Sequence, residues 1–328
     1  MIKIKVPGKL FISGEYAAVS PLYHSLIVPV NRYLSVQIKF FQNEFSIIKS
    51  GQKELKVNFI KLQTELEVSD YWLPIFKSLK TVRSFLLDKK INLNNFSLII
   101  ESDLEDLTYG KIGLGSSGAI TVATIKAILA LYKVEINATE TYHLALKAQI
   151  DQFQESSFGD IAIASFQKPI YYQKPKNLDS PLKIQTFSWP SNLKLFIGFT
   201  GEPYKTSMGV NKFNNLPAKV KTDFSQKVDE LTNLLYRNLI NDQPGVTNVF
   251  QNIANLYWNF DLRYNLGIFS PPLKKLVLSA NKLKIPAKQS GAGGGDCGIA
   301  IACEQKKESL YNNWEHENII PLNLEVVN

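Results

Sequence analysis

The stretch that decides the fold is Gly113-Leu114-Gly115-Ser116-Ser117-Gly118-Ala119, a glycine- and serine-rich loop directly before an apolar segment with helical spacing. Glycine lets the backbone turn and approach a ligand without a Cβ clash. The free N–H groups and the positive dipole end of a helix N-terminus favour phosphate. We therefore predict that residues 113–119 bind the phosphates of a nucleotide, and that the hydroxyl of Ser116 or Ser117 contacts a bound Mg²⁺.

A loop that only caps the following helix is the alternative interpretation of residues 113–119. The loop is not a Walker A motif, because no Gly-Lys-Ser or Gly-Lys-Thr ending follows the glycines. It is not a Rossmann fingerprint either, because the third glycine is displaced from the required spacing. The local pattern alone leaves both interpretations open.

A second glycine-rich stretch, Ser290-Gly291-Ala292-Gly293-Gly294-Gly295-Asp296-Cys297-Gly298, places five glycines within eight residues. Successive backbone amides in such a loop can surround an anion. A tight turn between a helix and a strand would explain this stretch equally well if it stood alone. Two such loops in one basic chain favour a protein that binds two anionic ligands.

Two charged residues near turns are candidates for chemistry. Lys9 follows Pro7-Gly8 at the end of a predicted strand, where an ammonium can meet developing negative charge. Asp160 closes the segment Ser156-Ser157-Phe158-Gly159-Asp160, and its carboxylate could orient a substrate or bind metal. The alternatives are a solvated surface lysine and an aspartate that caps a helix.

The distribution of apolar residues and turn signals predicts an α+β chain with two lobes. Residues 173–191 are rich in Pro and polar residues and form the expected linker between an N-terminal lobe, 1–172, and a C-terminal lobe, 192–328. Strands are predicted at 2–6, 26–40, 96–100, 161–166, 169–172, 193–200 and 298–303, with a hairpin at 45–60, and helices at 70–88, 116–132, 138–153, 217–240, 247–263 and 271–283.

Composition narrows the class of protein. The chain has 328 residues, of which 45% are hydrophobic, enough for a substantial core. The net charge of +8 favours anionic partners, but no basic tract indicates nucleic acid, and no apolar stretch is long enough to span a membrane. Two cysteines without a zinc pattern fit a reducing cytoplasm, and the N-terminus does not read as a signal peptide. We expect a cytoplasmic protein, monomeric or homodimeric.

Taken together, the segments Pro7-Gly8-Lys9 to Gly14-Glu15, 113–119 and 290–298 resemble, in order and spacing, the three motifs of the galactokinase, homoserine, mevalonate and phosphomevalonate kinase family. Within that family the resemblance is to the bacterial phosphomevalonate kinase branch. It rests on Gly14-Glu15-Tyr16, Ser157-Phe158-Gly159-Asp160, Asp296-Cys297-Gly298, and Gly198 to Pro203 with Thr206-Ser207. Ser156 and Gln167-Lys168 stand where the branch usually has glycine.

The resemblance implies an N-terminal lobe like the second domain of ribosomal protein S5 and a ferredoxin-like C-terminal lobe. It implies a kinase that uses ATP and Mg²⁺ to phosphorylate phosphomevalonate in isoprenoid synthesis, with Lys9 and Asp160 as catalytic residues. The acceptor-binding residues that it implies are Lys9, Ser157, Asp160, Thr206, Ser207, Ser290, Gly291, Ala292 and Gly293. A mevalonate or other alcohol kinase, and a sensor that binds nucleotide without turnover, remain alternatives.

Overall fold

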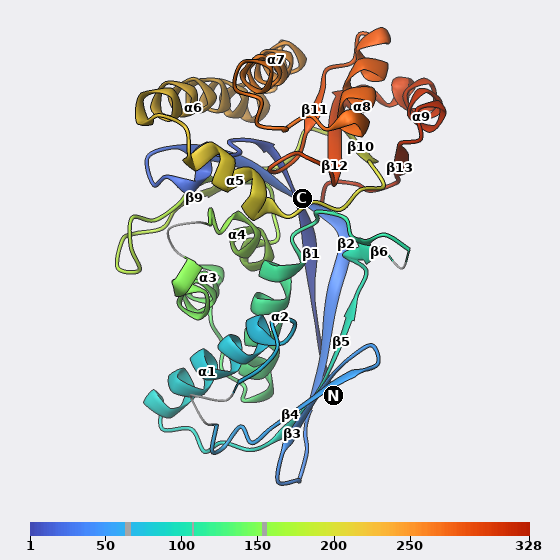
Figure 1. The fold of residues 1–328 in the computed structure, drawn as a ribbon. Helices are drawn as coiled ribbons and strands as arrows, with labels where there is room; N and C mark the ends of the chain where they lie inside the picture. Colours follow the sequence, from blue (N-terminus) through green and yellow to red (C-terminus); the bar gives the residue numbers. More distant parts are fainter. Residues whose placement is uncertain (63–66, 107, 153–155) are drawn as a thin grey trace.

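The computed structural model describes residues 1–62, 67–106, 108–152 and 156–328, which form two lobes, each built on its own β-sheet (Figure 1). The predicted α+β class with two lobes is confirmed. The predicted division of the chain at 173–191 stays a prediction, and part of that segment forms strand β9 of the N-terminal sheet. Among the described residues, no helix is long and apolar enough to cross a membrane.

The N-terminal sheet is mixed and its strands run in the order β4-β3-β5-β2-β8-β9, with β1 paired to β2. Helices α2 and α4 pack against β1 and β2, while α1 and α3 pack on α2. The strands are β1 (Ile2–Ser13), β2 (His24–Phe40), β3 (Ser46–Ser50), β4 (Lys53–Val57), β5 (Phe96–Ser102), β8 (Ile170–Gln173) and β9 (Lys183–Thr186). The helices are α1 (Leu73–Asp88), α2 (Ser116–Leu131), α3 (Ala138–Ala148) and α4 (Gly159–Phe166).

Strands β1 and β2 form a long antiparallel pair that reaches from the free end of the N-terminal lobe to the C-terminal lobe (Figure 1). The prediction that Pro7-Gly8 ends the first strand was wrong, because β1 continues to Ser13 through a register shift at Pro7/Gly8. Proline is tolerated at such an irregularity because it needs no ladder hydrogen bond there. The shift leaves Lys9 inside the strand, with its N–H bonded to Leu114 O at 2.9 Å.

The predicted strand at 161–166 was also wrong, because these residues belong to helix α4. Ile161, Ala162, Ile163 and Ala164 are all buried, so the helix has no polar face to reveal its period. A short apolar run of this kind cannot be assigned to strand or helix from periodicity alone. The helix predicted at 138–153 ends earlier, at Ala148, followed by the 3₁₀ turn η2 (Ile150–Gln152), and its last predicted residue lies outside the described residues.

The C-terminal sheet is antiparallel with strand order β11-β12-β10-β13. Numbered along the chain, this order reads 2-3-1-4, and helices separate the first strand from the second and the third from the fourth, as in the ferredoxin-like β-α-β-β-α-β arrangement. The strands are β10 (Lys194–Phe199), β11 (Ala287–Gln289), β12 (Cys297–Ala302) and β13 (Ile320–Leu322). The helices are α5 (Thr206–Asn214), α6 (Ala218–Ile240), α7 (Val246–Tyr264), α8 (Pro271–Lys282) and α9 (Lys307–His316).

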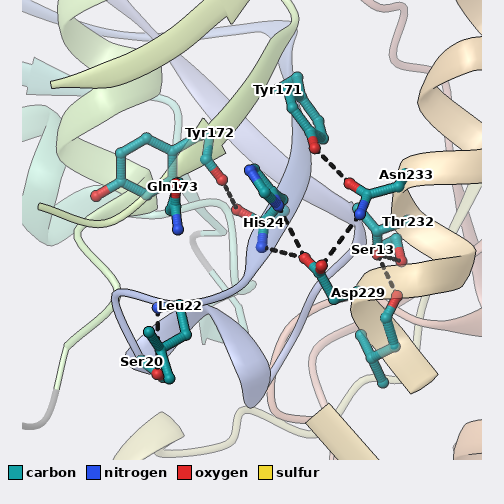
Figure 2. A network of polar contacts seen from close by, with 12 residues as sticks. Ser13, Ser20, Leu22, His24, Tyr171, Tyr172, Gln173, Asp229, Thr232 and Asn233 are labelled. Carbon is teal, nitrogen blue, oxygen red and sulfur yellow. Dashed lines mark hydrogen bonds and ion pairs between the residues drawn. The ribbon is translucent and has the colours of Figure 1, made fainter. Parts of the chain in front are cut away.

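Polar contacts between α6 and the N-terminal sheet join the two lobes (Figure 2). Asp229 Oδ1 accepts a hydrogen bond from the His24 backbone N–H at 2.6 Å and lies 2.9 Å from His24 Nδ1. The hydroxyls of Ser13 and Thr232 are 2.6 Å apart. These contacts fix the far end of β1 against the C-terminal lobe, and a cleft lies where the lobes meet.

Candidate functional site

A cleft of about 620 Å³ lies between the lobes and draws its walls from segments far apart in the sequence. The N-terminal lobe contributes the β1 residues around Lys9, the loop and helix start at 113–117, and the turn at 156–160. The C-terminal lobe contributes residues around the start of α5 and the loop at 290–292. The cleft therefore brings both glycine-rich stretches and both candidate catalytic residues to one place.

The loop before α2 has the backbone that the sequence predicted from its glycines. Gly113 and Gly115 have φ of +81° and +80°, a left-handed region that non-glycine residues adopt at a cost. Helix α2 begins at Ser116, and no side chain of the described residues caps its N-terminus. The N–H groups of its first turn and the hydroxyls of Ser116 and Ser117 are thus placed at the cleft.

Two of the predicted loop residues lie behind the cleft wall. Gly118 packs against the Asp160 side chain, where an added Cβ would come within 2.5 Å of Asp160 Cγ. Ala119 is 1% exposed and belongs to the core. An added Cβ at Gly115 would lie 2.8 Å from Lys9 Cγ and 3.3 Å from Asp160 Cβ. The glycines therefore make room for the two candidate catalytic side chains as well as for a ligand.

Lys9 and Asp160 face the cleft from β1 and from the first turn of α4. Lys9 Nζ donates a hydrogen bond to Gly113 O at 3.0 Å. Burial raises the pKa of the Asp160 carboxyl above its usual range, opposed chiefly by the Lys9 charge and by backbone N–H groups such as that of Ile161. The pair places one fixed cation beside a carboxyl group that holds its proton more tightly than usual.

Buried tyrosines hold the turn that precedes Asp160. The Tyr172 hydroxyl donates to Ser157 O at 2.8 Å and lies 2.8 Å from the Tyr142 hydroxyl. Phe158 has a φ of +54°, which is uncommon outside glycine, and its side chain is fully buried. These constraints place Ser157 and Asp160 together on the wall of the cleft.

Five of the six predicted acceptor residues of the C-terminal lobe line the cleft, and they come from two segments. Thr206 and Ser207 begin α5 and line the cleft. Ser290, Gly291 and Ala292 also line it.

Gly293 does not belong to the cleft wall in the part of the chain that the structure describes. An added Cβ at this position would lie 2.3 Å from Ile268 O, so Gly293 packs against the segment before α8. Gly293 is thus a buried residue of the 290–298 loop.

Four cleft residues were not predicted as site residues from the sequence. Lys111 and Lys205 add two cations to the wall. Glu15 and Asp296, which the sequence placed in two of the motifs without a role of their own, add two carboxylates. Burial raises the pKa of Asp296, against the opposing effect of the Tyr204 N–H, which donates to its Oδ1 at 3.0 Å. Lys111 lies two residues before Gly113, and Lys205 directly precedes Thr206. Their nearness to predicted site residues is the sequence feature that could have identified them.

A magnesium ion fits the donors at the start of α2. In phosphoryl-transfer sites Mg²⁺ is held by one or two protein oxygens together with substrate phosphates and water. Among the described residues, no group of three or more His, Cys, Asp or Glu side chains could hold a metal by itself. The hydroxyls of Ser116 and Ser117 share the cleft with the Asp160 carboxyl, which suits an ion that takes its other ligands from phosphate.

Two domains of one protein family match the chain, and the matched residues include both glycine-rich loops and Asp160. "GHMP kinases N terminal domain" matches residues 76–168, with the 113–119 loop and Asp160 inside it, and "GHMP kinases C terminal" matches residues 246–319, with the 290–298 loop inside it. The chain belongs to the GHMP kinase family. Both matched ranges include residues that line the cleft.

Relatives of this GHMP kinase cover its full length. It is 28% identical to a phosphomevalonate kinase of Streptomyces sp. (strain CL190) over 97% of this chain and 95% of that protein. It is 23% identical to a mevalonate kinase of Methanocaldococcus jannaschii over 99% of each. The solved structure of Streptococcus pneumoniae phosphomevalonate kinase in complex with phosphomevalonate and AMPPNP is 25% identical, with a TM-score of 0.86 and complete coverage of both chains.

Proposed function

We propose that this GHMP kinase transfers the γ-phosphoryl group of ATP to the 5-phosphate of (R)-5-phosphomevalonate, which gives 5-diphosphomevalonate and ADP on the mevalonate route to isopentenyl diphosphate. An oxygen of the acceptor phosphate bonds to the γ-phosphorus, and the bond from that phosphorus to the β,γ-bridging oxygen breaks. The Streptomyces and Streptococcus phosphomevalonate kinases, similar over nearly the whole chain, support this choice of acceptor.

The observation that carries the proposal is that both glycine-rich loops open into the cleft that holds Lys9. The 113–117 loop and the 290–292 loop come from different lobes, and each offers backbone N–H groups to an anion. Lys111 and Lys205 increase the positive charge of the same walls. Such a cleft suits two phosphorylated substrates better than a phosphate donor and an acceptor whose reacting group is an uncharged hydroxyl.

The residues act mainly by positioning and by charge, which is what phosphoryl transfer requires. Residues 113–117 bind the ATP phosphates at the N-terminus of α2, and Lys9 stabilises the negative charge that develops on the transferring group. Ser157, Thr206 and the 290–292 amides bind the acceptor phosphate. Because that phosphate is already largely ionised near neutral pH, Asp160 acts through position and electrostatics more than as a general base.

Magnesium, held through Ser116 or Ser117, supplies neutralisation of the phosphate charge when it is bound. We place the reaction in the cytoplasm, where ATP is available and where the two free cysteines, Cys297 and Cys303, stay reduced. The small-molecule substrates are the partners that we propose, for a monomer or homodimer.

The test is kcat/KM for phosphomevalonate and for mevalonate, measured by ADP release under the same Mg²⁺ and ATP. A site built for the acceptor phosphate leaves buried donors unpaired when that phosphate is missing, so we expect a preference on the order of 10⁴. Comparable values, or a preference for mevalonate, would assign the protein to the alcohol kinases. Tight ATP binding without ADP release for any acceptor would identify a sensor.

A further inference from the structure

Lys288 is buried behind the cleft and is paired with Glu15, a residue of the cleft wall. Lys288 Nζ, in β11, lies 2.5 Å from Glu15 Oε1, just beyond β1, and the two side chains are 0% and 2% exposed. Burial lowers the pKa of Lys288, and the Glu15 carboxylate opposes that shift. Full burial of such groups is rare unless they are paired, so this contact needs a physical reason.

The pair forms hydrogen bonds with the backbone at the start of the 290–298 loop. Glu15 Oε1 also accepts a hydrogen bond from the Gly291 N–H at 3.4 Å, and Lys288 Nζ donates to Gln289 O at 2.7 Å. The Tyr257 hydroxyl, on α7, donates to Glu15 O at 2.9 Å. The two side chains therefore connect the end of β1 with the first residues of the loop.

Two further contacts join the same segments. Ser290 Oγ donates to Phe11 O at 3.0 Å, and the Tyr16 hydroxyl donates to Ala292 O. Tyr16 adopts a φ of +64°, which is strained for a residue with a Cβ and is retained only where surrounding contacts hold it. Residues 11–16 and 288–292 thus form one braced unit, and β1 carries Lys9 two residues before Phe11.

Stability alone does not explain the charged pair, because well-packed apolar residues commonly replace buried ion pairs at little or no cost in stability. We propose that the Glu15–Lys288 pair is a clasp that fixes Gly291 and Ala292 relative to the strand carrying Lys9, and that Lys288 is a positioning residue for phosphoryl transfer. The inference rests on the proposed function for its kinetic part. Lys288 is not among the described residues that line the cleft, so it acts through Glu15.

The kinetic test is a cycle of Lys288→Met, Glu15→Gln and the double variant, with kcat and KM measured for both substrates. Loosening the loop should raise the KM for phosphomevalonate at least about tenfold and leave the KM for ATP within about threefold, since displacement of about 1 Å can cost about 10²-fold. Because Lys288 acts through Glu15, the double variant should be no worse than the worse single variant. Effects that multiply, or an unchanged KM for phosphomevalonate in Lys288→Met, would overturn the clasp.

Lys126→Met is the matched control, since Lys126 is a partly buried lysine of α2 whose pKa is lowered by burial and which lies outside the cleft lining of the described residues. It should leave both KM values unchanged. A rise in the phosphomevalonate KM of this control equal to that of Lys288→Met would mean that loss of any buried lysine produces the effect, and would also overturn the proposal.

Hydrogen exchange tests the clasp without any substrate. In Lys288→Met, amides in 290–294 should exchange at least about tenfold faster relative to those of β12, whether or not the protein accepts phosphomevalonate. If the unpaired Glu15 carboxylate prevents folding, the double variant, which buries no carboxylate, carries the same measurement. Unchanged exchange at 290–294 overturns the clasp, whereas faster exchange in a protein that does not use phosphomevalonate overturns only the proposed substrate.

Discussion

Replacement of Gly118 by alanine isolates the packing between the 113–119 loop and Asp160. The added Cβ would lie 2.5 Å from Asp160 Cγ, 2.6 Å from its Oδ2 and 2.8 Å from its backbone carbon. Carbon atoms pack at about 3.5–4.0 Å, so Asp160 or the start of α2 must move by about 1 Å. A misplacement of that size commonly lowers the rate about 10²-fold, and we expect kcat to fall by that factor.

The stability of Gly118→Ala should change much less than its activity. Alanine inside a helix is favoured over glycine by about 1 kcal/mol, whereas overpacking costs about 1–3 kcal/mol. The net loss in the free energy of unfolding is therefore about 0–2 kcal/mol. Urea unfolding measures this value, and steady-state ADP release with phosphomevalonate measures kcat on protein confirmed to be folded.

Gly198→Ala is the matched control for overpacking. Its Cβ would lie 2.8 Å from Ile319 Cγ2 and 2.9 Å from Leu276 Cδ1, in the core of the C-terminal lobe. This variant should lose about 1–3 kcal/mol of stability while kcat stays within about twofold. A folded Gly118→Ala protein that keeps kcat within about threefold would refute the reasoning, as would an equal fall of kcat in both variants.

Three further predictions address single contacts. Because burial raises the pKa of Asp160, the native state binds more protons than the unfolded state, and wild-type stability falls as pH rises from about 4 through that raised pKa. Asp160→Asn should therefore have the higher Tm at pH 8, with the gap closing near pH 4, and lower but measurable turnover; a gap independent of pH would contradict this. Lys9→Met removes the cation bonded to Gly113 O and should lower kcat about 10²–10³-fold at nearly unchanged Tm, whereas a change of only a few-fold would make Lys9 an ordinary surface residue. Asp229→Ala removes the acceptor of the His24 backbone N–H and of its Nδ1, so urea unfolding should show a loss of about 1–3 kcal/mol in the free energy of unfolding. No loss would mean that water replaces the carboxylate.

The helices that sequence predicted well have at least one clear end. The helix predicted at 116–132 is α2, which begins directly after the Gly/Ser loop, and the helix predicted at 271–283 is α8, which has prolines at its start and Pro286 beyond its end. Helices α5 and α9 were missed because they are short and bury few residues, in α9 only Leu310 and Trp314. Periodicity reports burial, so it fails for helices that bury almost nothing and for α4, which buries nearly everything.

The candidate site was predictable in its parts but not in its assembly. Glycine loops and a turn that ends in Asp160 have local signatures, so residue types at short spacing indicated them. The contact between Glu15 and Lys288 spans 273 positions of sequence and depends on how the two lobes dock. No local pattern distinguishes a lysine that will be 0% exposed from the solvated lysines elsewhere in this basic chain.

The structure also changes the physical role assigned to the loop glycines. From the sequence, we explained these glycines by the close approach of a phosphate. In this fold, the space left by their missing Cβ atoms is occupied by protein side chains. An added Cβ at Gly113 would meet Asp296 Cβ at 2.7 Å, at Gly115 it would meet Lys9, and at Gly118 it would meet Asp160. The loop is therefore the surface on which charged residues from three distant segments converge. Replacing one of these glycines by alanine should therefore lower kcat by a larger factor than it lowers the affinity for nucleotide. In a loop that only contacts phosphate, the loss of nucleotide affinity would be the larger effect.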